Sequence, residues 1–216
     1  MLIIKKFLTV FNKLKENYYM NDLRKRNNIF LGKDVFIDKD SVIKNKKLII
    51  GDKTLINGPI TITGGQLVQI GKYCAMGYHI TIISTNHKDY YPNLQIAFQQ
   101  KYHLQSLIGN KGPIIIGNNV WVGDCAIILP GVRIGDGVII GAGSVITHDI
   151  PAYSVVVGVP GKVIKKRFSD EIIKELRNIK WWDWSEQQIK KNKKFFKCDL
   201  RNITVNEIKK ICLEYK

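Results

Sequence analysis

The sequence predicts an all-β solenoid with helices at both ends, and two observations carry this prediction. One is a six-residue repeat through the middle of the 216-residue chain, and the other is amphipathic patterning at both ends. A period of six matches neither the 3.6 residues of an α-helix nor the alternation of a half-buried strand. It indicates a short strand and a turn that recur, so that each coil of the solenoid stacks on the next.

The repeat is clearest over residues 116–151, which divide into six hexads. The first residue is Ile or Val in all six, the second is Gly in four, and the fifth is Val, Ala, Ser or Ile. We expect the first residue to point inward and to stack on its counterpart one coil away, at the ~4.8 Å spacing of paired strands. The same phase continues upstream at Leu31, Ile37, Ile43, Ile50, Ile56, Ile62, Ile70, Met76 and Ile82.

Two segments interrupt the repeat. Residues 64–69 form a minor irregularity, whereas residues 84–113 form a long excursion without hexads. Such an insertion into a regular stack is more often functional than decorative. We therefore expect the excursion to carry part of the site.

The two ends of the chain are predicted to be helical. Residues 1–20 place Ile3, Phe7 and Phe11 on one face, which either packs on the first coil or lies on an anionic membrane surface. The short polar face, with four lysines, favours packing. Beyond residue 168, capping patterns at Ser169, Ser185 and Thr204 predict two or three short helices that cover the open edge of the last coil. The predicted organisation is an N-terminal helical segment (1–30), a solenoid domain (31–168) and a C-terminal helical segment (169–216).

Charge and cysteine content narrow the class of protein. The net charge is +16, with 7 Lys and Arg against 2 acidic residues in 1–30 and 16 against 8 in 162–216. Basic ends can serve a membrane surface, a nucleic acid or a phosphorylated ligand, but no nucleic-acid-binding motif is present. Four cysteines without a C-x-x-C pair indicate free thiols in a reducing cytoplasm and no zinc site. Apolar runs are too short to cross a bilayer or to form a signal peptide, so we expect a cytoplasmic protein, at most in contact with the membrane's inner face.

Three strings in the repeat region identify a known family. They are Ile116-Gly-Asn-Asn-Val-Trp-Val-Gly, Ile140-Gly-Ala-Gly-Ser-Val and Gly158-Val-Pro-Gly-Lys. Over residues 31–168 the chain resembles the hexapeptide-repeat acyltransferases, in the galactoside, maltose and nodulation branch. Residues 167–185 are similar to the tail of xenobiotic and streptogramin acetyltransferases and of capsule enzymes. The resemblance implies a left-handed parallel β-helix, a homotrimer with active sites between subunits, and transfer of an acyl group from acyl-CoA to a hydroxyl or amine.

The resemblance also implies which residues carry the chemistry. His87, in Ser84-Thr-Asn-His at the root of the excursion, matches the family's catalytic histidine, and an imidazole suits a general base near neutral pH. Among the other histidines, His79 is interpreted as a surface or interface residue. His103 is a candidate for the acceptor pocket, and His148 is expected beside the cofactor.

The expected cofactor is acetyl-CoA, which acts as the acyl donor, and no metal is expected. By resemblance its pantetheine arm follows small residues and backbone, and its phosphates meet the basic segment after the last coil. Trp121 is interpreted equally well as a cofactor neighbour or as a packing residue between coils or subunits. The expected cofactor-binding residues are Trp121, Asp124, Ala142, Gly143, Thr147, His148, Pro160, Lys162, Lys165 and Lys166.

The favoured function is O-acetylation of a sugar or a surface-polysaccharide precursor. After the histidine the antibiotic enzymes continue differently from Lys88-Asp-Tyr-Tyr-Pro92, which argues against drug acetylation. Acetylation of a xenobiotic and N-acetylation of an amino sugar stay open as alternatives. A γ-type carbonic anhydrase would need three histidines around zinc, and the four histidines here do not reproduce that spacing.

Overall fold

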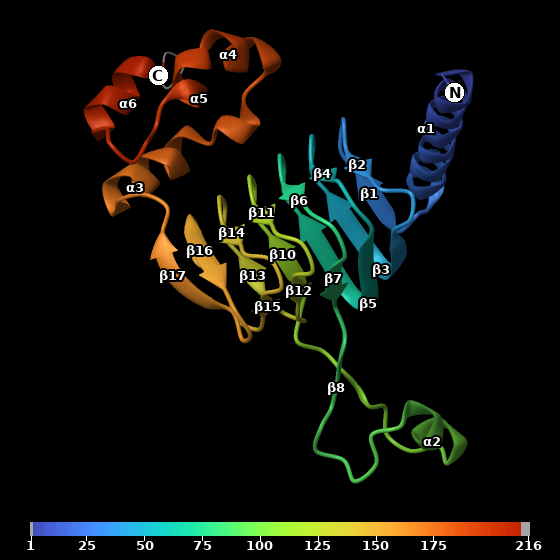
Figure 1. Ribbon diagram of the computed structural model, residues 1–216. Helices are drawn as coiled ribbons and strands as arrows, with labels where there is room; N and C mark the ends of the chain where they lie inside the picture. The colour runs from blue at the N-terminus through green and yellow to red at the C-terminus, as the bar shows by residue number, and fades with distance from the viewer. Residues whose placement is uncertain (1, 213–216) are drawn as a thin grey trace.

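The computed structural model describes residues 2–212 of the chain, with side chains described from residue 14 onward. Its body is a stack of coils with three strand faces, drawn in blue through orange in Figure 1. All strand pairs along the stack are parallel up to the last coil. This architecture confirms the fold class expected from the repeat.

Each coil contributes one strand to each face. The first face holds β1 (Ile29–Leu31), the C-terminal parts of β3 (Val42–Ile50) and β5 (Ile60–Ile70), β10 (Ile114–Ile116) and β13 (Arg133–Ile134). The second holds β2 (Phe36–Ile37), β4 (Leu55–Ile56), β6 (Ala75–Met76), β11 (Trp121–Val122), β14 (Ile139–Ile140) and β16 (Ser154–Val157). The third holds the N-terminal parts of β3 and β5, β7 (Ile80–Ile83), β12 (Ile127–Ile128) and β15 (Val145–Ile146).

The first residue of each hexad fills the interior of the stack. From Ile116 to Ile146 these six residues are at most 2% exposed. Burial of one such aliphatic side chain is worth roughly 1.5–3 kcal/mol. A coil on its own would leave this surface in water, so the repeat is stable only as a stack.

The minor irregularity that the sequence shows at residues 64–69 is a corner of the solenoid at which the strand continues. These residues lie inside β5, which runs through the corner between the third and first faces and pairs with β3 on both sides of a register shift at Asn45. Gly64 adopts a φ of 109° at this corner, and a Cβ there would lie 2.5 Å from Ser84 Oγ. Glycine is therefore required where the backbone turns against the next coil.

The C-terminal end of α1 (Leu2–Lys25) closes the first coil. Met20 and Leu23 are buried in the solenoid core, and the Tyr19 hydroxyl donates to the carbonyl oxygen of Ser41 at 3.0 Å. The apolar residues expected on the helix at Ile3, Phe7 and Phe11 lie outside the described side chains. Within residues 2–212, no helix combines the length and apolarity needed to span a membrane.

The last coil is covered first by a strand and then by helices. β17 (Lys162–Lys166) turns back and pairs antiparallel with β16, an element that the sequence did not predict. More helical segments follow than the two or three expected, although the caps predicted at Ser169, Ser185 and Thr204 are all present. They pack with Tyr153 in a second apolar cluster above the solenoid in Figure 1. These segments are α3 (Asp170–Ile179), η1 (Trp181–Asp183), α4 (Glu186–Lys191), α5 (Lys193–Lys197) and α6 (Val205–Ile211).

The excursion projects from the solenoid as an arm (Figure 1). Its base is a two-stranded antiparallel ribbon of β8 (Asn86–His87) and β9 (Ile108–Gly109), and its tip carries α2 (Ile96–Lys101). Large apolar side chains on it are exposed, among them Tyr90 at 71% and Tyr102 at 53%. In a single chain the arm thus leaves much of its apolar surface in contact with water.

Candidate active site

A narrow groove lies at the corner where the second face meets the third. Trp121, Asp124 and Ala142, three residues expected beside the cofactor, line it together with Ile139, Ile140 and two glycines, around a volume of about 270 Å³. The structure therefore brings these three residues into one place, although they come from two successive coils.

Close backbone packing shapes the groove. A Cβ on Gly123 would lie 2.6 Å from the Ala142 nitrogen, so a larger residue would push the coils apart. Asp124 Oδ1 accepts a hydrogen bond from the Tyr78 N–H at 2.8 Å and fixes the turn to the previous coil. Gly143, another residue expected beside the cofactor, is not among the residues that line the groove; it has a φ of 67° and open space where a Cβ would be.

His87 lies at a different corner, between the third and first faces. It is exposed on the ribbon at the base of the arm, and among the described residues no hydrogen bond fixes its ring. The second ring nitrogen of a catalytic imidazole is normally fixed by a hydrogen bond, and the described part of one chain supplies none. Thr147 and His148 occupy the same corner on a later coil, where Thr147 Oγ1 lies 2.7 Å from His148 Nδ1.

One chain therefore divides the expected site into two parts. His87, Thr147 and His148 follow strands of the third face. Trp121 lies in β11 of the second face, and Asp124 and Ala142 follow strands of that face. The third face lies between the two corners. Chemistry that needs both parts would need a second copy of the chain.

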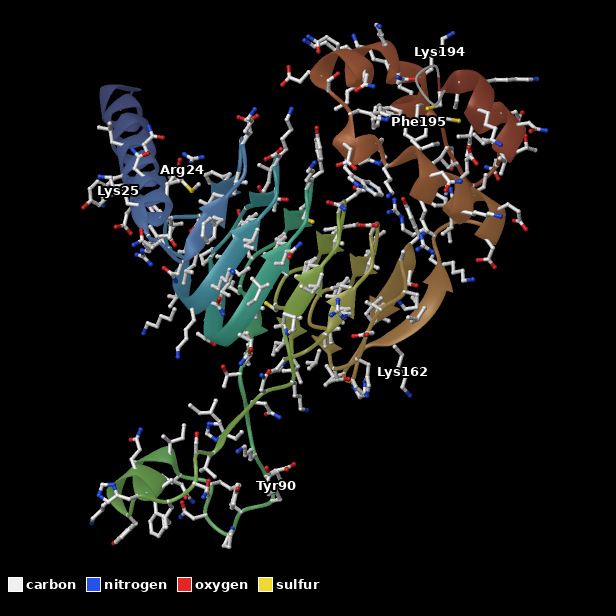
Figure 2. All side chains as sticks on the ribbon, turned by 180° about the vertical axis from the view of Figure 1, so that it is seen from behind. Arg24, Lys25, Tyr90, Lys162, Lys194 and Phe195 are labelled. Carbon is white, nitrogen blue, oxygen red and sulfur yellow. The ribbon has the colours of Figure 1, made fainter. Side chains whose placement is uncertain are left out.

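The basic residues after the last coil are spread along β17. Lys162 lies at the hairpin end, far from the C-terminal helices (Figure 2), next to the turn that contains Pro160. Lys166, at the other end, forms an ion pair with Asp170. Lys165 faces a separate cavity between β17 and the C-terminal helices. The three lysines expected to cluster around the phosphates of the cofactor thus lie in a row along β17, each in a different environment.

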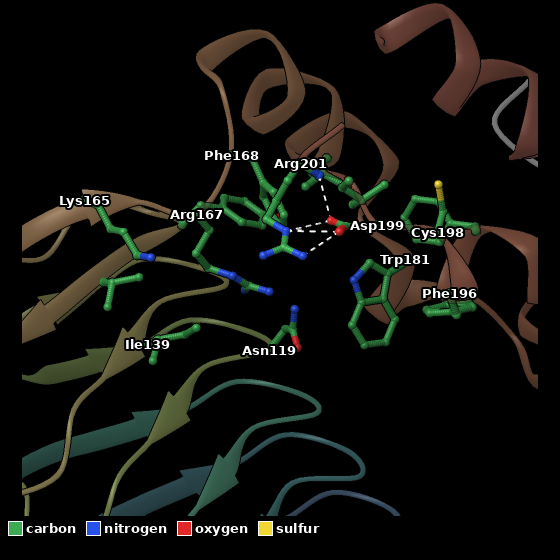
Figure 3. A pocket seen from close by; sticks show the side chains of 15 residues that line it. Asn119, Ile139, Lys165, Arg167, Phe168, Trp181, Phe196, Cys198, Asp199 and Arg201 are labelled. Atoms are coloured by element: carbon green, nitrogen blue, oxygen red, sulfur yellow. Dashed lines mark hydrogen bonds and ion pairs between the residues drawn. The ribbon is translucent and has the colours of Figure 1, made fainter. Parts of the chain in front are cut away.

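That second cavity was not expected from the sequence. Lys165, Arg167, Asn119, Trp181 and Arg201 are among its lining residues (Figure 3), and its volume is about 500 Å³. Arg201 comes from the distant tail, and no motif marks it. Only the folded C-terminal segment brings it beside the solenoid.

The titratable groups of the described chain offer no metal centre. No group of three or more His, Cys, Asp or Glu residues within the described part is placed to hold a metal ion. Cys74, Cys125 and Cys198 are free thiols. Burial raises the pKa of the Cys74 thiol to about 11.

Comparisons with known proteins give one family match and several relatives. The family described as bacterial transferase hexapeptide (six repeats) matches residues 113–148. A chloramphenicol acetyltransferase of Morganella morganii is 36% identical over 129 residues, which are 56% of this chain and 61% of that protein. A probable macrolide acetyltransferase of Lysinibacillus sphaericus is 39% identical over 133 residues, 58% of this chain and 74% of that protein. The match thus spans about six-tenths of the length of the chloramphenicol acetyltransferase.

Solved structures share the solenoid. A galactoside acetyltransferase in complex with coenzyme A is 26% identical with a TM-score of 0.55, over 72% of this chain and 80% of that one. AntD, an N-acyltransferase from Bacillus cereus in complex with dTDP and 3-hydroxybutyryl-CoA, is 25% identical with a TM-score of 0.58, over 70% and 78%.

Proposed function

The chain belongs to the bacterial hexapeptide-repeat transferases, and we propose that it transfers an acetyl group from acetyl-CoA to a hydroxyl group of a sugar or of a surface-polysaccharide precursor. The observation that carries this proposal is the groove lined by Trp121, Asp124 and Ala142, three residues that the sequence resemblance predicts to lie beside acetyl-CoA. The galactoside acetyltransferase that shares the fold was solved with coenzyme A.

The groove suits the thin pantetheine arm of the donor. Gly123, Gly141 and Ala142 add little side-chain bulk to its lining, so an extended chain can approach the backbone closely there. The hairpin after β16 lies beside it, since the Gly161 N–H donates to the Val145 carbonyl at 2.8 Å and the Gly158 N–H to Ser144 Oγ at 3.2 Å. We assign the donor's phosphates to the end of this hairpin, at Pro160 and Lys162, where a cation is exposed.

His87 is the proposed general base. It takes the proton of the acceptor hydroxyl as that oxygen attacks the thioester carbonyl carbon. The new C–O bond forms, the C–S bond breaks, and the proton passes from the imidazole to the departing thiolate of CoA. No net proton is gained or lost by the enzyme, and no other reactant is needed.

A homotrimer would unite the two halves of the site. On the outer side of the second face, five apolar side chains from five successive coils lie in register and form a ladder. Two of them are widely exposed to solvent, Leu55 at 44% and Trp121 at 56%. The arm carries further exposed aromatic side chains. We propose that second faces pack together around a three-fold axis and that the arm of one copy brings its His87 toward the groove of the next. The ladder consists of Leu55, Ala75, Trp121, Ile139 and Val155.

A second acceptor class is supported by the relatives. The relatives include chloramphenicol acetyltransferases and a probable macrolide acetyltransferase. The same base and groove would serve a drug hydroxyl or an amino sugar, because only the acceptor pocket differs.

Release of the CoA thiol from acetyl-CoA, measured against a panel of acceptors, tests the proposal. The panel holds nucleotide sugars, saccharide fragments, amino sugars, chloramphenicol and a streptogramin. Release with a saccharide hydroxyl supports the proposal, and release with drugs alone assigns the protein to the resistance enzymes. No release, together with no binding of acetyl-CoA, would contradict an acyltransferase of any kind.

A further inference from the structure

The cavity between the solenoid and the C-terminal helices has the character of a ligand site of its own. It lies at the corner between the first and second faces, whereas the groove lies at the opposite edge of the second face. The two share Ile139 in their linings. Its volume of about 500 Å³ is within the range of small-molecule sites.

Positive charge exceeds negative charge in this cavity, whose lining holds three cations and one carboxylate. Arg167 is half-buried, and among the described residues no carboxylate pairs with it. Its Nη1 donates to the Gly137 carbonyl at 2.7 Å, and burial lowers the pKa of its guanidinium. Lys165 adds a second cation on the same wall, also without an ion pair in the described chain. A partly desolvated cation is costly unless a negative charge reaches it.

Arg201 approaches from the opposite wall. It is held by Asp199, with Nε 2.9 and 3.1 Å from the two carboxylate oxygens and Nη2 2.6 Å from Oδ2. Figure 3 shows its guanidinium directed toward that of Arg167, with the Asn119 side chain beneath both. Two guanidinium groups that face each other repel unless an oxyanion lies between them. Asp199 is the single acidic residue in the lining, against three cations.

The remaining walls are aromatic. Phe168, Trp181 and Phe196 line the cavity, and the Arg167 guanidinium lies 5.0 Å from the centre of the Phe168 ring. A bare phosphate would leave most of this space unfilled. A flat ring attached to the phosphate would pack on the aromatic wall, because nucleobases stack favourably on aromatic side chains.

From these contacts we infer that the cavity binds a nucleoside phosphate, with the phosphate between Arg167 and Arg201 and the base against Trp181. The site is separate from the donor groove and does not depend on the proposed transferase activity. Asn119, whose amide faces the two guanidinium groups, donates a further hydrogen bond to the phosphate.

Equilibrium dialysis of the full chain with uridine and adenosine 5′-monophosphates, ribose 5-phosphate and inorganic phosphate, at fixed ionic strength, tests this inference. We expect at least one of the two nucleotides to bind about tenfold or more tightly than ribose 5-phosphate. Arg201→Ala should weaken that binding about tenfold or more, because a charge-assisted bidentate contact is lost. Arg201→Lys, which keeps the charge but not the fork, should give an intermediate loss.

The matched control is Lys44→Ala, which removes an exposed cation from β3 at the far end of the solenoid. It should leave the affinity unchanged, and saturating coenzyme A should shift the nucleotide Kd by less than about twofold. The inference is overturned by absence of nucleotide binding, by equal binding of ribose 5-phosphate, or by equal losses in the Arg201 and Lys44 variants. Displacement by coenzyme A would also overturn it, since the cavity would then hold the adenosine end of the donor.

Discussion

The side-chain amide of Asn45 donates a hydrogen bond to Ser84 Oγ at 2.8 Å, although the two residues are 39 positions apart. The same nitrogen lies within hydrogen-bond distance of the carbonyl oxygens of Gly64 and Gln66, at 3.2 and 3.0 Å. Asn45 is therefore a buried link between three successive coils. It fixes the backbone just three residues before His87, where the arm leaves the solenoid.

Asn45→Ala should destabilise the fold by about 1–3 kcal/mol, because Ser84 Oγ and two carbonyl groups lose their buried donor. Urea unfolding followed by circular dichroism measures this change. The matched control is Asn57→Ala at an exposed turn, which should cost less than about 0.5 kcal/mol. Equal stability of the two variants would contradict the role given to Asn45.

Loss of the side-chain hydroxyl should have opposite effects on the stability of the fold at two tyrosines. Tyr153 is 2% exposed, and within the described chain its hydroxyl has no hydrogen-bond partner. Tyr153→Phe should therefore keep or increase the stability, since an unpaired buried polar group is removed. Tyr19→Phe should instead cost about 0.5–1.5 kcal/mol, because the bond to Ser41 is lost. Thermal unfolding of both variants checks the pair, and a large loss at Tyr153 would reveal a partner for its hydroxyl.

The thiols should differ strongly in reactivity. Cys74 is buried, and this burial raises its pKa from 9.0 to about 11, whereas Cys125 is exposed at a corner. The thiolate is the reactive species, so alkylation of Cys74 at pH 8 should be at least about a hundredfold slower than that of Cys125. Peptide mapping after timed iodoacetamide treatment measures both rates, and equal rates would refute the burial of Cys74.

The raised pKa of Cys74 also makes the stability of the fold depend on pH. As pH rises, the thiol of the unfolded chain ionises before that of the native chain, so the free energy of unfolding falls between about pH 9 and 11. Denaturant titrations of the wild type across this range should show falling stability. Cys74→Ala should show a smaller fall over the same pH range, and an identical fall would assign the alkaline loss to other groups.

Ala142→Leu should close the groove. The added side chain would fill the space between Trp121 and the turn at Asp124, so the Kd for coenzyme A should rise about tenfold or more. The control is Ala97→Leu, on an exposed position of α2 in the arm, which should bind coenzyme A as the wild type does. Calorimetric titration measures the Kd for coenzyme A of both variants, and an unchanged Kd for Ala142→Leu would show that the donor does not bind in this groove.

The hexads predicted the body of the fold because the first residue of each one is apolar and points into the solenoid. The buried residues Ile116, Val122 and Ile128 follow directly from a period of six. The corners with an unusual course were missed, since the run of β5 through Gly64 depends on Asn45 and Ser84, which are remote in sequence. β17 was missed for a similar reason: a basic, exposed strand has no pattern of its own and forms only where β16 offers an edge.

The candidate site could be predicted in its parts but not in its assembly. Asp124 and Ala142 meet because each follows a strand of the second face at the same phase of the repeat, and Trp121 joins them from β11, the strand that precedes Asp124. His87 follows a strand of the third face, so no argument from the repeat alone places it in the groove. The cavity with Arg167 and Arg201 depends on how the tail folds back, which no local pattern encodes.

The most direct test of the proposed chemistry compares the wild type with His87→Ala and His79→Asn, using an acceptor identified by the panel. Release of the CoA thiol from acetyl-CoA is measured together with the Kd for coenzyme A. We predict that His87→Ala lowers turnover by about 10²–10⁴ with an unchanged Kd, because only the proton transfer is lost. His79→Asn should keep turnover within a few-fold of the wild type. Turnover of His87→Ala equal to that of the wild type would contradict the account, since the reaction would then proceed without the base on which it depends.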